Sequence, residues 1–167
     1  MTQKKHFLMT GQMLITTVPT EIITVLGSCI SVCLWDNRLK MAGMNHYLLP
    51  GHDREEAGNA NRGHSSIRML IRSMLNRQSS IEHLEAKIFG GSNSLYLHND
   101  QFEVGKRNIE VALQVLKEYN IRLVANQTGG CYGRKIIFNT STGKVRMKLL
   151  KKSAIQINEE IHKGFGV

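Results

Sequence analysis

Runs of apolar residues, separated by turn-forming residues, divide this chain into short strands and two helices. Residues 22–35 are rich in β-branched and small apolar side chains, which is typical of buried strands. Turn-forming residues follow at 36–38, and a second apolar run occupies 39–49. This pattern predicts an antiparallel hairpin whose turn is centred on Asn37 and Arg38.

Two segments have the apolar spacing of amphipathic helices. The first carries an apolar stripe at i, i+3, i+4, i+7 and i+8, beginning at Ile67, and the second spans about 104–119. Further strands are predicted at 84–89, 121–126, 134–139 and 144–150. We therefore expect one mixed α/β domain of the α+β class over residues 1–167, rich in strands and with two main helices.

Composition agrees with a globular protein that needs no disulfides. The chain has 167 residues, of which 41% are hydrophobic and 21% are charged. Its apolar runs fall short of the ~20 residues that a membrane-spanning helix needs. The three cysteines are too few and too unevenly placed for a disulfide scaffold. We expect a cytoplasmic protein with reduced thiols.

The formal net charge is +9, and basic residues are concentrated near the C-terminal end. Seven lysines and arginines lie between Arg134 and Lys152 with no acid among them. Such a stripe attracts polyanions, although a solvated strand face explains it equally simply. A nucleic-acid module is the least favoured interpretation, because aromatic residues that could stack on bases scarcely occur among these basic residues.

The sequence Gly27-Ser28-Cys29 is the sharpest candidate for chemistry. Glycine and serine ahead of a cysteine allow an irregular backbone whose N–H groups converge on an anion, such as the oxyanion formed when Cys29 attacks a carbonyl. A free thiol titrates near ~8.5 and needs a basic neighbour to become a nucleophile at neutral pH. The competing interpretation is a buried structural cysteine.

The predicted hairpin supplies that neighbour. A turn at Asn37 and Arg38 places His46 directly opposite Cys29, where Cβ atoms lie ~4.5–5.5 Å apart. A register shift of one residue would place Tyr47 there instead, and His46 could equally be a core histidine. Zinc binding by Cys29 and Cys33 is disfavoured, because four positions along a strand span ~13 Å.

Five blocks of the chain closely resemble one family over nearly the whole length. They are TVLGSCISVCLWD at 24–36, GMNHYLLP at 43–50, LEAKIFGGSNSL at 84–95, GKRNIEVALQVL at 105–116 and NQTGGCYGRKIIFNTSTGKVRMK at 126–148. In this order they are similar to the CheD family, the bacterial chemoreceptor glutamine deamidases.

The resemblance implies a role for each residue that matches the family pattern. Cys29 matches the nucleophile, His46 matches the general base and acid, and Thr24 is the candidate for the third catalytic residue. Backbone amides around Gly27 and Ser28 would hold the oxyanion. No metal or organic cofactor is implied. The implied fold, similar to that of bacterial toxin glutamine deamidases, is a β-sandwich core flanked by helices.

The resemblance also implies partners. These are the cytoplasmic helices of methyl-accepting chemotaxis receptors and a CheC-type phosphatase of the response regulator, with no nucleic acid and no insertion into the membrane. Hydrolysis of receptor glutamate methyl esters is a further activity that the same chemistry allows. The alternative is a non-catalytic adaptor that acts by binding the phosphatase. An enzyme should carry a thiolate at Cys29 that is alkylated faster than Cys33 or Cys131.

Overall fold

The computed structural model describes residues 3–52, 58–93 and 101–150. In this part of the chain, two α-helices and nine strands form an α+β fold, as the sequence predicted. No helix among the described residues is both long and apolar enough to cross a membrane. In chain order the elements are β1 (Lys4–Phe7), β2 (Met13–Thr16), β3 (Thr20–Leu26), β4 (Ile30–Asp36), β5 (Met41–Asn45), α1 (Gly63–Leu75), a short 3-10 helix (Ile81–His83), β6 (Leu84–Gly90), α2 (Gln101–Glu118), β7 (Arg122–Thr128), β8 (Gly133–Asn139) and β9 (Val145–Leu150).

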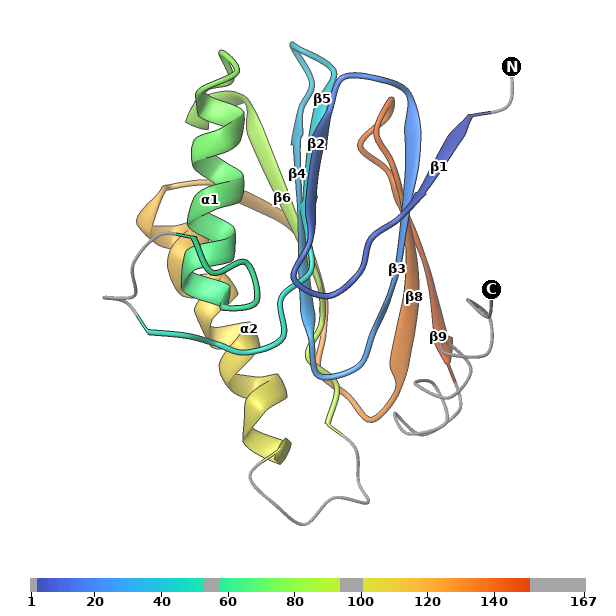
Figure 1. Ribbon diagram of the computed structural model, residues 1–167, viewed down its shortest axis with the longest axis vertical. Helices are drawn as coiled ribbons and strands as arrows, with labels where there is room; N and C mark the ends of the chain where they lie inside the picture. Colours follow the sequence, from blue (N-terminus) through green and yellow to red (C-terminus); the bar gives the residue numbers. More distant parts are fainter. Residues whose placement is uncertain (1–2, 53–57, 94–100, 151–167) are drawn as a thin grey trace.

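The strands form two mixed sheets that pack face to face. One sheet has four strands in the order β1-β3-β8-β9, and the other has five in the order β2-β5-β4-β6-β7. Both helices lie on the outer side of the five-stranded sheet, so the molecule has a helical layer and two sheet layers (Figure 1). This is the predicted sandwich with its helices on one side.

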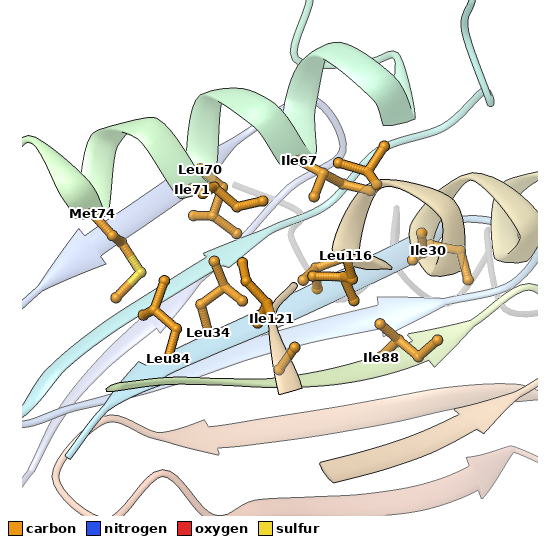
Figure 2. Packing of buried hydrophobic residues seen from close by; sticks show 14 of the residues in the cluster. Ile30, Leu34, Ile67, Leu70, Ile71, Met74, Leu84, Ile88, Leu116 and Ile121 are labelled. Carbon is orange, nitrogen blue, oxygen red and sulfur yellow. The ribbon is translucent and has the colours of Figure 1, made fainter. Parts of the chain in front are cut away.

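The helix-side core is made almost entirely of large aliphatic side chains. Strand β4 contributes Ile30, Val32 and Leu34, which are every second residue and therefore share one face of the sheet. The apolar stripe of α1 packs directly against this face (Figure 2). Its members are Ile67, Leu70, Ile71 and Met74, all of which are fully buried.

The inter-sheet core uses the alternate residues of the same strands. It contains Cys33 from β4, Ala42 and Met44 from β5, and Ile22 and Leu26 from β3. Because side chains alternate along a strand, Thr24 belongs to the same inward face as Ile22 and Leu26, and His46 continues the face of Ala42 and Met44.

The sequence missed two features of this architecture. Strands β1 and β2 have four residues each, too few for a clear alternating pattern. The run 22–35 is not one arm of a hairpin but two strands, β3 and β4, which belong to different sheets and are joined by Gly27, Ser28 and Cys29.

The predicted register of the β4–β5 hairpin was also wrong. Asp36 pairs with Met41, so the turn comprises residues 37–40 rather than Asn37 and Arg38 alone. The Asp36 carboxylate accepts a hydrogen bond from the backbone N–H of Leu39, which closes this longer turn, and Lys40 adopts a positive φ of 51°. The direct pairing of Cys29 with His46 is therefore lost.

Candidate active site

The β3–β4 connection, the residues directly after β6 and the β7–β8 connection meet at one end of the sandwich, at the bottom of Figure 1. The Cys29 carbonyl accepts a hydrogen bond from the N–H of Gly91 at 2.8 Å, and the Gly27 carbonyl accepts one from the N–H of Ser92 at 2.9 Å. The N–H of Gly129, in the β7–β8 connection, donates to Gly90 at 2.9 Å. These bonds fix the segment that carries Cys29 against the two neighbouring connections.

Gly90 is required by this close approach. Its φ is +110°, and a Cβ atom built at this position would lie 2.1 Å from the Cys29 carbonyl oxygen. Any side chain would push the β3–β4 connection away from the sheet. The sequence Phe89-Gly90-Gly91 therefore serves to seat the cysteine segment.

His46 reaches the site because the β4–β5 ladder is interrupted just before it. The Asn45 side chain accepts a hydrogen bond from Val32 N–H at 2.8 Å and donates one to Ser66 Oγ of α1 at 2.9 Å. The backbone of His46 instead pairs with the β1–β2 connection, donating to the Gln12 carbonyl and accepting from Gly11 N–H. The histidine is thereby held between the two sheets.

The imidazole ring of His46 lies between two threonine hydroxyls. Thr24 Oγ1 is 2.9 Å from Nδ1, and Thr10 Oγ1 is 3.3 Å from Nε2. Thr24 Oγ1 also lies 2.7 Å from the Leu8 carbonyl, to which it donates its single hydrogen. Thr24 can therefore only accept from His46, which places the ring proton on Nδ1. Nε2 is then an acceptor, and in the resting site the Thr10 hydroxyl donates to it.

Cys29 and His46 are diagonal neighbours rather than a directly opposed pair. Ile30 and Tyr47 exchange two backbone hydrogen bonds, so Cys29 lies opposite residue 48, and His46 lies opposite Ser31. Diagonal positions on one face of a sheet are ~7–8 Å apart, within reach of a long side chain. Within the described residues, no hydrogen bond joins the Cys29 thiol to the His46 ring.

Burial acts against charge on both groups. Desolvation raises the pKa of the half-buried Cys29 thiol to about 11, although its own backbone N–H favours the thiolate. Desolvation lowers the pKa of His46 to about 4, and the Leu8 carbonyl acts weakly in the opposite direction. The resting site therefore holds a neutral thiol and a neutral imidazole, and the preferential alkylation of Cys29 stays a prediction.

Gly27 and Ser28 lie where the sequence placed them, in the turn before Cys29. Their carbonyl groups point into the structure, with that of Gly27 bonded to Ser92 and that of Ser28 accepting from Asn108 Nδ2 at 3.0 Å. The sequence analysis did not single out Asn108. It could have been noticed as a polar residue on the apolar stripe of the second helix, one turn before Ala112.

Cys33 and Cys131 are not part of the turn that carries Cys29. Cys33 is fully buried in the inter-sheet core, and Cys131 is exposed in the β7–β8 connection. Burial raises the pKa of Cys33 to about 12. In the described ranges, no three His, Cys, Asp or Glu side chains gather as a metal site would require.

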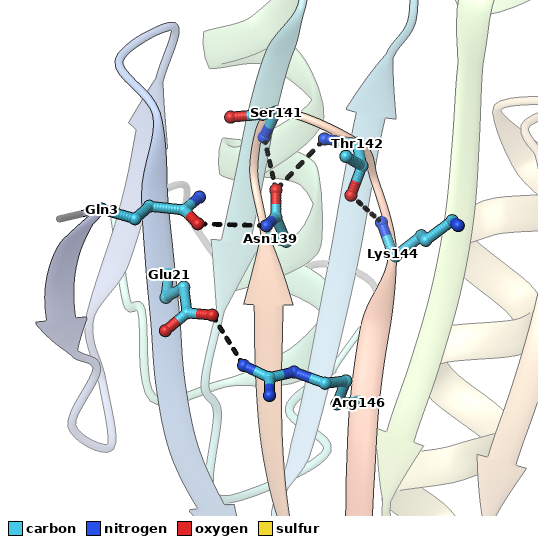
Figure 3. A network of polar contacts seen from close by, with 7 residues as sticks. All are labelled: Gln3, Glu21, Asn139, Ser141, Thr142, Lys144 and Arg146. Carbon is cyan, nitrogen blue, oxygen red and sulfur yellow. Dashed lines mark hydrogen bonds and ion pairs between the residues drawn. The ribbon is translucent and has the colours of Figure 1, made fainter. Parts of the chain in front are cut away.

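The basic stripe is not continuous. Arg134 is buried and donates hydrogen bonds to the carbonyls of Gln127, Gly129 and Tyr132, so it stabilises the β7–β8 connection instead of facing a partner. Arg146 forms an ion pair with Glu21 on β3 (Figure 3). The exposed cations that remain on β8, β9 and the turn between them are Lys135, Lys144 and Lys148, while Lys151 and Lys152 lie outside the described residues.

Fold and site together define a class: an α+β protein with a cysteine in a glycine-containing turn and a histidine, bonded to a threonine, just beyond the end of β5. A family model described as CheD chemotactic sensory transduction matches residues 48–149. This chain belongs to the CheD family. The matched range begins after His46, so it carries no information about Thr24, Cys29 or His46.

Relatives from several organisms are similar over most of their length. A Trichlorobacter lovleyi protein is 43% identical over 142 residues, which cover 85% of this chain and 88% of that protein. A Sulfurimonas denitrificans protein is 36% identical, with 92% of this chain and 99% of that protein covered. Both are named "Probable chemoreceptor glutamine deamidase CheD". A solved Neisseria meningitidis protein aligns with a TM-score of 0.44 at 9% identity, over 77% of this chain and 65% of that chain.

Proposed function

We propose that this protein deamidates glutamine side chains of chemoreceptors to glutamate, with Cys29 as the nucleophile and His46 as the general base and acid. Membership of the CheD family and the names of its relatives support the substrate. The observation that carries the chemistry is the bond between Thr24 Oγ1 and His46 Nδ1, because it keeps Nε2 unprotonated, so that Nε2 can act as a base once the cysteine replaces the Thr10 hydroxyl as its donor.

The reaction is an acyl transfer through a thioester. Cys29 Sγ attacks the carboxamide carbon while its proton passes to His46 Nε2, and a backbone N–H of the turn stabilises the oxyanion. The imidazolium returns this proton to the departing nitrogen, and ammonia leaves. Water, activated by the same Nε2, then attacks the thioester and releases glutamate and the free thiol.

Burial of both groups determines when the proton moves. Since the pKa of Cys29 is raised to about 11 and that of His46 is lowered to about 4, a resting thiolate–imidazolium pair is unfavourable. Proton transfer therefore accompanies the formation of the C–S bond, after the substrate brings the diagonal pair together. Thr24 acts as a positioning residue that keeps Nε2 unprotonated.

The same steps would hydrolyse a receptor glutamate methyl ester, with methanol in place of ammonia. Both substrates present an acyl carbon at the same position of the receptor helix. The receptor is the proposed substrate in either case, and a CheC-type phosphatase is the proposed regulatory partner.

Mass spectrometry of a chemoreceptor cytoplasmic fragment, incubated with the protein and its variants, tests this function. With the wild-type protein or Cys131→Ala, the receptor fragment should gain about 1 Da per converted glutamine, because deamidation replaces NH₂ by OH. With Cys29→Ala the mass of the fragment should not change. Cys131 is the matched control because it is the exposed cysteine of a neighbouring connection. Absence of conversion with folded protein and reduced Cys29 would favour the adaptor that binds the phosphatase without catalysis.

A further inference from the structure

Asn108 ties the helical layer to both segments that carry the site. Its side chain is fully buried on α2. The amide Nδ2 donates to the Ser28 carbonyl at 3.0 Å and to the Leu48 carbonyl at 2.9 Å. Ser28 directly precedes Cys29, and Leu48 lies opposite Cys29 on the segment that carries His46.

The two carbonyl acceptors determine the orientation of the Asn108 amide. A primary amide has two N–H hydrogens, and both are used here, whereas Asn108 Oδ1 is buried without a hydrogen-bond partner in the part of the chain that the structure describes. A buried oxygen without a donor is unfavourable. The opposite orientation of the amide would place Oδ1 against two carbonyl oxygens. The observed orientation is therefore the one that secures Ser28 and Leu48.

Securing the Ser28 carbonyl also sets the direction of the next N–H. In a trans peptide the C=O of one residue and the N–H of the following residue point in opposite directions. Because the Ser28 carbonyl points towards α2, the Cys29 N–H points away from the helical layer. Within the described residues, no backbone carbonyl accepts from this N–H, which faces the Cys29 sulfur itself.

We propose that Asn108 is a positioning residue that fixes the Ser28–Cys29 peptide so that the Cys29 N–H donates to the oxyanion formed on Cys29. This inference rests on the proposed nucleophile. It gives the second helix an effect on the transition state through the Ser28–Cys29 peptide, since a donor that is already aimed strengthens its bond as charge develops on the oxygen.

The test compares Asn108→Leu and Asn108→Ala with Tyr47→Phe. The two Asn108 variants remove the donor, one with similar volume and one with a small cavity. The Tyr47 hydroxyl donates to the Asn108 backbone carbonyl at 2.6 Å, so Tyr47→Phe loosens the same point of α2 without touching the Ser28 peptide. Removing an oxyanion donor costs about 10²–10³ in kcat, and misdirecting one should cost about 10- to 100-fold.

Two readouts separate this inference from the proposed function. The first is deamidation of the receptor fragment, in which both Asn108 variants should lower kcat with little change in KM. The second is acylation of Cys29 by p-nitrophenyl acetate, followed by intact mass, which forms the same kind of oxyanion without any receptor. Both Asn108 variants should acylate about 10- to 100-fold more slowly, while their alkylation by iodoacetamide, which forms no oxyanion, should stay within about 2-fold of wild type.

Each outcome decides one of the two proposals. If the wild-type protein acylates at Cys29 but converts no glutamine, the proposed function fails and the acylation rates still test Asn108. Wild-type acylation rates in both Asn108 variants would overturn the inference, as would an equal loss in Tyr47→Phe, which would indicate general anchoring of α2. A wild-type protein that is not acylated at Cys29 would overturn both proposals.

Discussion

The two interior layers of this protein are built from alternate residues of the same strands, yet they differ in what they can do. The helix-side layer contains Ile30, Val32 and Leu34 of β4 against the apolar stripe of α1. The inter-sheet layer combines large side chains such as Phe89 and Phe138 with small ones such as Cys33 and Ala42, and it continues into the buried polar residues of the site. The first layer supplies mainly apolar burial, and the second holds the groups that are proposed to react.

The difference shows how a small domain can bury a reactive site. Polar groups that leave water need partners, and in the inter-sheet layer Thr24 and His46 are partners for each other and for the Leu8 carbonyl. The helix-side layer supplies apolar burial, which offsets the free-energy cost of burying these polar groups. Substitutions in the two layers should therefore have separable effects on stability and on chemistry.

The largest effect is expected in the helix-side layer. Leu70→Ala should destabilise the protein by about 2–5 kcal/mol, because Leu70 is fully buried between α1 and β5 and its removal leaves a cavity. Deamidation per folded molecule should not change, since Leu70 packs in the helix-side layer, on the opposite face of the sheet from the inter-sheet residues. Urea unfolding measures the first effect, and the receptor assay in the stable range measures the second.

Leu113→Ala on α2 is the matched control for this prediction. Leu113 is 38% exposed, so the same truncation should cost less than about 1 kcal/mol. A loss of specific activity in Leu70→Ala that persists where the protein is fully folded would contradict the separation of the two layers.

The second effect is the response of the inter-sheet layer to acid. The pKa of His46 is lowered from 6.5 to about 4 in the folded protein, so below pH 6.5 the unfolded chain takes up a proton that the folded protein does not. The free energy of unfolding should fall by about 3 kcal/mol as the pH drops from 6.5 to 4. Above pH 6.5 this contribution to stability should be fully present. In His46→Gln the loss over this range should be smaller by that amount.

Unfolding free energies measured at several pH values check this difference. An NMR titration of the His46 ring protons is the independent measurement, with an expected midpoint near 4. A midpoint at or above 6.5 would mean that the ring is solvated or paired with a thiolate, and the neutral resting pair would be wrong.

Much of the fold follows from patterns that are local in sequence. The stripe beginning at Ile67 predicts α1, and the apolar runs predict β6, β7 and the β8–β9 hairpin within one or two residues. These elements are long enough for their periodicity to be clear. The four-residue strands β1 and β2 are not, and they form only because β3 and β5 offer pairing partners.

The site was less accessible to sequence reasoning for a physical reason. The sequence correctly placed Cys29 and His46 in one region but predicted the wrong register between them. The register depends on the length of the turn after Asp36, and the Asp36 carboxylate closes that turn by accepting hydrogen bonds from Leu39 and Ser79. The Thr24–His46 contact joins two sheets, which no pairing rule within one hairpin could predict. Arg134 was counted as a surface charge because its acceptors are carbonyls, which leave no trace in the sequence.

The smallest effect is expected for the hydrogen bond between Thr24 and His46 in the inter-sheet layer. Thr24→Val keeps the shape of the side chain but removes the acceptor of His46 Nδ1–H, so the ring is free to place its proton on Nε2, where it blocks the base. One neutral hydrogen bond is worth about 1 kcal/mol, so kcat should fall about 5-fold with little change in KM. Thr24→Ser retains the hydroxyl and should retain most of the activity.

Thr20→Val provides the control on the same strand. Thr20 is also buried in β3, and its hydroxyl donates to the Val18 carbonyl at 2.9 Å, far from the imidazole. Both valine substitutions should cost similar stability, but only the one at position 24 should lower kcat and change the ¹⁵N shifts that report the His46 tautomer. If both lowered kcat equally and left the tautomer as it is, Thr24 would be an ordinary buried threonine, and the chemistry of His46 would depend on Thr10 and the surrounding backbone alone.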